Sequence, residues 1–68
     1  MIIDFNDYDG YYIASMTVNE LPNLMDYITI KTRCKQISGK VISIEKEYNI
    51  FKNIVRNIVK IDYRIPKE

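Results

Sequence analysis

Histidine and tryptophan are absent from this 68-residue sequence, and cysteine occurs once, at Cys34. Without histidine the chain lacks the commonest acid–base side chain and a major zinc ligand, and a single thiol cannot form an internal disulfide. The two glycines, Gly10 and Gly39, stand far apart, so no glycine-rich loop is available to hold a phosphate. We therefore predict a protein that is not an enzyme and that binds no cofactor and no metal.

Long apolar runs are also missing. No segment approaches the length of a membrane span, and the first ten residues carry acids where a secretory signal carries its positive charge. We expect a cytoplasmic protein without membrane contact. Frequent Ile, Lys, Asn and Tyr, which have AT-rich codons, favour a low-GC bacterium or its phage as the source. A phage-encoded chain acts in the host cytoplasm.

The length of the chain permits one domain, residues 1–68. A domain of this size hides about 60% of the surface that its unfolded chain exposes, and it commonly needs a disulfide, a metal or a partner subunit for stability. The residues for the first two are lacking here, while 47% of the chain is hydrophobic. We therefore expect a homodimer.

Charge is distributed unevenly along the chain. Residues 1–28 contain five acids and no base, whereas residues 29–68 contain ten bases and four acids. The net charges of the two parts are thus −5 and +6, which agree with +1 for the whole chain. This asymmetry is the most informative feature of the sequence, because it provides two surfaces of opposite sign for binding.

Alternation of apolar and polar residues predicts several strands. Residues 11–18, 26–34 and 40–44 alternate in this way, and residues 59–66 do so again near the end. Asn6, Asp7, Asp9 and Gly10 form a turn-forming cluster typical of a hairpin tip. Short connections between the strands favour an antiparallel meander. Cys34 falls on the predicted core side of its strand, where a thiol is an inert small hydrophobe.

The segment near residues 45–58 can be interpreted as an amphipathic helix. Its apolar residues recur at steps of three and four, with acids near the start and bases near the end. Ile, Val and Asn are mediocre helix formers, so packing must hold such a helix. Our primary prediction is a β-rich α+β domain that combines an antiparallel sheet of three to five strands with this helix.

The alternative is an all-β barrel, and a family resemblance carries it. ISGKVISIEKEYNI resembles the first motif of Sm-like RNA-binding proteins, and RNIVKI echoes the second. The matching positions are Gly39, Val41, Ile44, Glu45, Tyr48, Asn49 and Ile50. Ser43 replaces a usual glycine, Glu45 replaces a usual aspartate, and the long hairpin between the motifs is missing. The resemblance implies a small Sm-like or SH3-like barrel and a nucleic-acid-binding module.

The amino-terminal part suggests a protein-binding surface. Tyrosines favour interfaces because they bury a large ring and keep a hydroxyl for hydrogen bonding, and acids beside them attract a basic partner. The candidate partner-binding residues are Asp4, Asp7, Tyr8, Asp9, Tyr11 and Tyr12. Our leading hypothesis is a phage-type inhibitor, a DNA mimic that occupies the basic nucleic-acid-binding site of a host DNA-transaction protein. Solvated turn acids and core tyrosines explain the same residues without a partner.

Two further sets of residues are candidates for contacts. Lys31, Arg33 and Lys35 lie on one side of a predicted strand and form the nucleic-acid-binding surface of the alternative hypothesis. Self-association is expected from an apolar stripe, Ile50, Phe51, Ile54 and Val55. A third interpretation has the acidic and basic parts neutralise each other across a dimer interface. The sequence does not decide among these.

Overall fold

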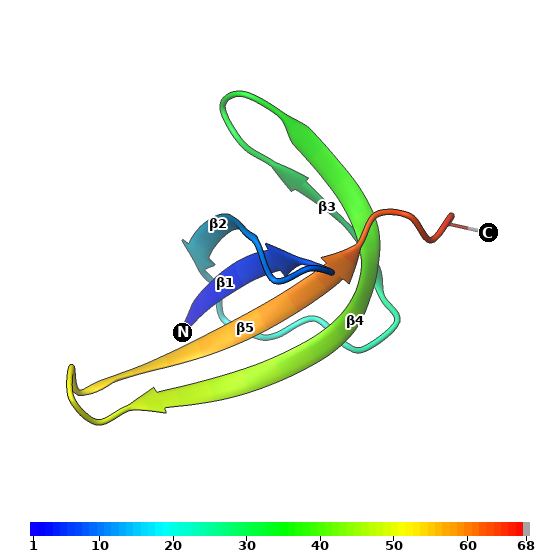
Figure 1. Cartoon of the computed structure of the whole chain (residues 1–68). Helices are drawn as coiled ribbons and strands as arrows, with labels where there is room; N and C mark the ends of the chain where they lie inside the picture. Colours follow the sequence, from blue (N-terminus) through cyan, green and yellow to red (C-terminus); the bar gives the residue numbers. More distant parts are fainter. Residues whose placement is uncertain (68) are drawn as a thin grey trace.

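The protein is all-β in a computed structural model that describes residues 1–67. Five strands follow one another along the chain (Figure 1). They are β1 (Ile2–Asp7), β2 (Tyr12–Thr17), β3 (Tyr27–Lys31), β4 (Gln36–Asn49) and β5 (Ile54–Asp62). The predicted hairpin tip at residues 6–10 is confirmed, since β1 and β2 pair antiparallel on either side of it.

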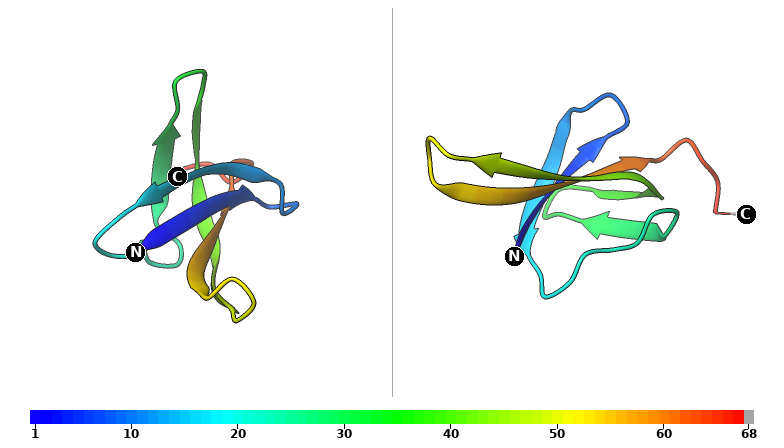
Figure 2. Two further views of the ribbon diagram at one scale, coloured as in Figure 1. Left: turned by 90° about the vertical axis from the view of Figure 1, so that its left-hand side faces the viewer. Right: turned by 90° about the horizontal axis from the view of Figure 1, so that it is seen from below.

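One curled sheet contains all five strands in the order β2-β1-β5-β4-β3. β1 and β5 pair in parallel, and the other neighbouring pairs are antiparallel. The simple antiparallel meander predicted from the short connections is therefore wrong: β2 and β3 follow each other in sequence but form the two edges of the sheet. The sheet curls into an open half-barrel, as the two views of Figure 2 show.

The predicted helix near residues 45–58 is wrong, and so is the α+β fold class; the alternative of a small all-β fold fits. These residues comprise the last five residues of β4, a tight turn and the first part of β5. Asparagines make the turn: the Asn49 side chain accepts a hydrogen bond from the Lys52 amide at 2.9 Å, and Asn53 adopts a left-handed φ of 57°. Asn tolerates that conformation well, and the dense Ile and Val favour strands over a helix.

The core lies on the concave side of the half-barrel. Its buried side chains come from four strands and comprise Ile3, Phe5, Ile30, Val41, Val59 and Ile61. Alternation puts these residues on one face, because Ile3 and Phe5 of β1 pair with Asn57 and Val59 of β5. Partly buried Ile13, Ile28 and Ile44 extend the cluster.

β4 bends sharply enough to serve both halves of the sheet. Its first residues pair with β3, its later residues pair with β5, and the register shifts between Val41 and Ser43. Such a bulge increases local twist. Near the bend, β4 and β5 pack closely at Gly39: a Cβ added there would lie 2.9 Å from backbone atoms of Asp62. Glycine is therefore required for the strands to pass each other.

Beyond the barrel, the β4–β5 hairpin continues alone as a two-stranded arm (Figure 1). β1 pairs with β5 only from Asn57 onward, whereas β4 pairs with β5 as far as Asn49 and Ile54. We call residues 47–56 the arm. The arm contributes to the elongated shape of the molecule, which measures 40 × 25 × 24 Å. Within residues 1–67 there is no helix long and apolar enough to cross a membrane.

A candidate protein-binding groove

Residues from both predicted binding surfaces line a single groove. Asp7, Tyr11 and Tyr12 come from the acidic, tyrosine-rich segment, and Lys35 comes from the basic one. Ile13, Gln36, Ile37, Ser38 and Tyr63 complete the lining of a hollow of about 510 Å³. We call it the tyrosine groove. Its volume falls in the range of about 300–1,000 Å³ that is typical of ligand-binding clefts.

The β1–β2 turn shapes one wall of the tyrosine groove. The Asp7 carboxylate accepts hydrogen bonds from the backbone amides of Asp9 and Tyr11, both at 2.9 Å. Gly10 adopts a left-handed φ of 91°, which closes the turn. Asp7 is therefore a structural turn residue that also brings its charge to the groove. The described contacts include no ion pair of Asp9, which is exposed in the same turn.

Tyr8 is partly buried against neighbouring side chains and does not line the groove. Its ring lies 5.2 Å from that of Tyr63, and the Arg64 guanidinium lies 3.6 Å above it. Arg64 also donates two hydrogen bonds from its side chain to Asp62, each at 2.9 Å, and these lower the pKa of that carboxyl. The Tyr8 hydroxyl, with the carboxylates of Asp7 and Asp9, raises the pKa of Tyr63. Tyr63 therefore stays neutral at the groove wall.

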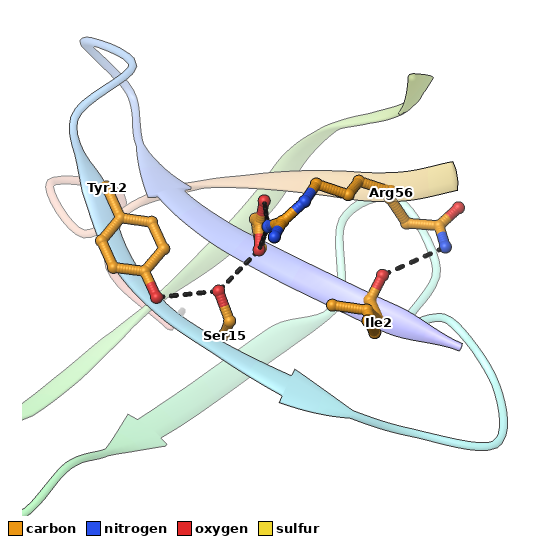
Figure 3. Close-up of polar contacts among 6 residues, drawn as sticks. Ile2, Tyr12, Ser15 and Arg56 are labelled. Atoms are coloured by element: carbon orange, nitrogen blue, oxygen red, sulfur yellow. Dashed lines mark hydrogen bonds and ion pairs between the residues drawn. The ribbon is translucent and has the colours of Figure 1, made fainter. Parts of the chain in front are cut away.

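Asp4 is engaged within its own chain and is not a free acid. Arg56 donates to both carboxylate oxygens, at 2.8 and 2.6 Å, and Ser15 donates a further hydrogen bond (Figure 3). Ser15 in turn accepts from the Tyr12 hydroxyl at 2.8 Å, because the serine proton is already used. Partial burial raises the pKa of Asp4, but the hydrogen bond from Ser15 and the ion pair with Arg56 outweigh it and lower the pKa overall.

The basic candidates cluster at the turn between β3 and β4. Lys31, Arg33 and Lys35 are all exposed there, and Thr32 fixes the turn through hydrogen bonds with the backbone of Lys35. Cys34 is exposed in this turn. The expectation that it packs in the core is therefore wrong, because the strand ends at Lys31 and the alternation no longer applies.

A second hollow, of about 500 Å³, opens between β2 and β3. Its floor is apolar and is formed by Ile3, Phe5, Met16, Val18, Ile28 and Ile30. Glu20, Asp26 and Lys31 also line it and give it polar edges. We call it the seam groove, since it lies where the half-barrel fails to close. Sequence analysis did not indicate this groove, because β2 and β3 belong to different hairpins.

The four residues predicted for self-association lie in the arm. Ile50 and Phe51 occupy its tip and are 91% and 95% exposed. Ile54 and Val55 begin the return strand, and both are exposed as well. Because none of the four belongs to the core of its own chain, all remain accessible for contact with another molecule.

The interior contains one unusual polar side chain, Asn57. It is 4% exposed, and its Nδ2 donates to the Ile2 carbonyl at 3.3 Å (Figure 3). Its Oδ1 is buried and lacks a hydrogen-bond partner within the described residues. Residues 1–67 contain no cluster of three or more His, Cys, Asp or Glu side chains that could bind a metal.

Comparisons with known proteins found no match: no family model, no curated protein and no solved structure matches the chain. The resemblance to Sm-like proteins thus gains no support from them. The segment that carries it, residues 37–50, lies mostly in the single strand β4. Function must be inferred from the surface of this chain alone.

Proposed function

We propose that this protein is a non-catalytic binding module that recognises a segment of a partner protein in the tyrosine groove. One observation carries the proposal: the fold brings Asp7, Tyr11 and Tyr12 together with Lys35 and Tyr63 around one hollow. Tyrosine is enriched among the residues that dominate protein–protein binding energy, since its ring is large and rigid and its hydroxyl forms hydrogen bonds.

Charge favours a protein over a nucleic acid as the occupant. Asp7 stands on one wall and Lys35 on the other, with Asp9 close to the first. A nucleic acid presents phosphates throughout, so the acidic wall would repel it. A polypeptide can carry a base and an acid at suitable spacing and so complement both walls.

The same charges restrict the kind of host protein that such an inhibitor could bind. DNA mimicry needs carboxylates that replace phosphates, yet Asp4 is neutralised by Arg56 and Asp7 supports a turn. Capture of a host DNA-handling protein stays a prediction, and the mixed charge of the groove supports a partner with both signs over a uniformly basic one.

A nuclease-treated pull-down with the tagged chain and lysate of a low-GC bacterium tests the proposal. Tyr11→Ala and Lys35→Glu should each abolish capture of a specific protein. Tyr48→Ala is the matched control, because Tyr48 is 68% exposed against 72% for Tyr11 but lies on the arm. If nuclease removes all retained material and Arg33→Glu matters while Tyr11→Ala does not, the basic turn binds nucleic acid and the proposal fails.

A further inference from the structure

The arm tip and the seam groove of the same molecule are both apolar. The tip presents two almost fully exposed apolar side chains, Ile50 and Phe51. The seam groove is an open hollow of about 500 Å³, and its apolar lining includes Phe5, Met16 and Ile28. Such a volume accommodates two large side chains. Neither feature has a counterpart within its own chain, because the arm projects away from the barrel (Figure 1).

The tip is held in a defined conformation. The Asn49 side chain accepts a hydrogen bond from the Lys52 amide, and Asn53 takes the left-handed conformation that closes the turn. Ile50 and Phe51 are thus presented on an ordered turn, which lowers the entropy lost when a partner covers them.

Charges at the two features are opposite in sign. Lys52 follows Phe51 at the tip and is exposed, and it forms no ion pair among the described residues. Glu20 and Asp26, both exposed, line the seam groove together with the exposed Lys31, so the acids there outnumber the bases by one. An apolar tip with a base beside it thus matches an apolar hollow whose lining carries a net negative charge, and a second copy of the chain presents such a tip.

We propose that the arm tip of one copy inserts Ile50 and Phe51 into the seam groove of a second copy, with Lys52 beside Glu20 and Asp26. Each copy has both a tip and a groove, so two reciprocal contacts close a two-fold dimer. The tyrosine groove is lined by different residues, which leaves it available for the partner protein.

A charge exchange tests this pairing. The tip variant is Lys52→Glu, and the groove variant combines Glu20→Lys with Asp26→Asn. Asparagine keeps the oxygen that accepts the Asn23 amide at 2.9 Å, so the loop retains its hydrogen bond. Sedimentation equilibrium should show that the wild-type chain is a dimer. For each variant alone, the dissociation constant of the dimer should be at least about tenfold larger, since like charges meet in both variants.

Mixing the two variants should restore the dimer. In the mixed pair, the glutamate tip meets the lysine-bearing groove, and the unchanged Lys52 tip meets the unchanged acidic groove. Asp9→Lys is the control for charge reversal outside the seam groove, and it should leave the dimer unchanged. Circular dichroism of each variant establishes that the fold is intact.

Two results overturn the proposal. The first is a wild-type chain that stays monomeric at every concentration tested. The second is loss of the dimer in the tip variant but not in the groove variant, which would show that tips pack against each other. Because Tyr11→Ala leaves both tip and seam groove intact, its effect on partner capture is tested separately from dimerisation.

Discussion

The two halves of the β4–β5 hairpin differ sharply in burial. In the barrel, Val41, Val59 and Ile61 are completely buried. In the arm, the same hairpin exposes Tyr48 on β4 and Ile50 and Phe51 in the turn. Full burial of one such side chain stabilises a fold by roughly 1.5–3 kcal/mol, so the barrel half contributes to folding and the tip contributes little. One half of the hairpin thus stabilises the fold, and the other half is exposed for contact with other molecules.

The largest effect on stability should come from removing a buried side chain in the barrel half of the hairpin. Ile61→Ala removes a completely buried side chain and leaves a cavity, which should lower the free energy of unfolding by about 2–5 kcal/mol. Urea denaturation of this variant beside Ile50→Ala measures the contrast. An equal loss in both variants would erase the distinction between barrel and arm.

A smaller loss is expected at the bend that joins the two halves. In Gly39→Ala the new methyl group meets the Asp62 backbone, which cannot move aside as a flexible side chain can. We expect the free energy of unfolding to fall by about 1–3 kcal/mol, as in other overpacked cores. Lys46→Ala, at an exposed position of the same strand, is the control in the same denaturation series. A stability for Gly39→Ala equal to that of the control would show that β4 and β5 can separate.

The ion pair between Asp4 and Arg56 links β1 of the barrel to the end of the arm on β5. The pKa of Asp4 is lowered in the folded state, so its stabilisation is complete above the unfolded pKa of about 3.9 and is lost as pH falls through the folded pKa. Asp4→Asn should therefore be less stable than wild type at neutral pH and lose less stability on acidification. Thermal unfolding at a series of pH values measures this, and parallel curves would contradict it.

The smallest effect on folding should come from the arm tip. Phe51→Ser changes a side chain that is 95% exposed, so the stability of the monomer should change by less than about 0.5 kcal/mol. Unfolding at concentrations below dimer formation measures it. A larger loss would mean that Phe51 packs within its own chain and that the arm is part of the barrel core.

The strands were predictable where apolar and polar residues alternate within one continuous segment. Residues 11–18 and 26–34 alternate clearly, and β2 and β3 lie within them. The helix prediction failed because Ile50, Ile54 and Ile58 recur at steps of four and also fit strands that meet at a turn. Asn49 and Asn53 were the overlooked turn signal. The parallel pairing of β1 with β5 depends on contacts across most of the chain, which local patterns do not report.

The candidate site was predictable by residue type and not by geometry. Tyrosines and charged residues drew attention to Tyr11, Tyr12 and Lys35, and the structure places all three around the tyrosine groove. The pairing of Asp4 with Arg56, 52 residues apart, was not predictable and removes one acid from the surface. Tyr63 joins the groove only because β5 ends beside the β1–β2 turn.

The affinity of a captured partner for three forms of the chain tests the central claim most directly. Isothermal titration of wild type, Tyr11→Ala and Tyr48→Ala compares two tyrosines of similar exposure, one in the tyrosine groove and one on the arm. We predict that the dissociation constant for the partner is at least about tenfold larger for Tyr11→Ala and unchanged for Tyr48→Ala. The reverse pattern would place partner binding on the arm and contradict the account.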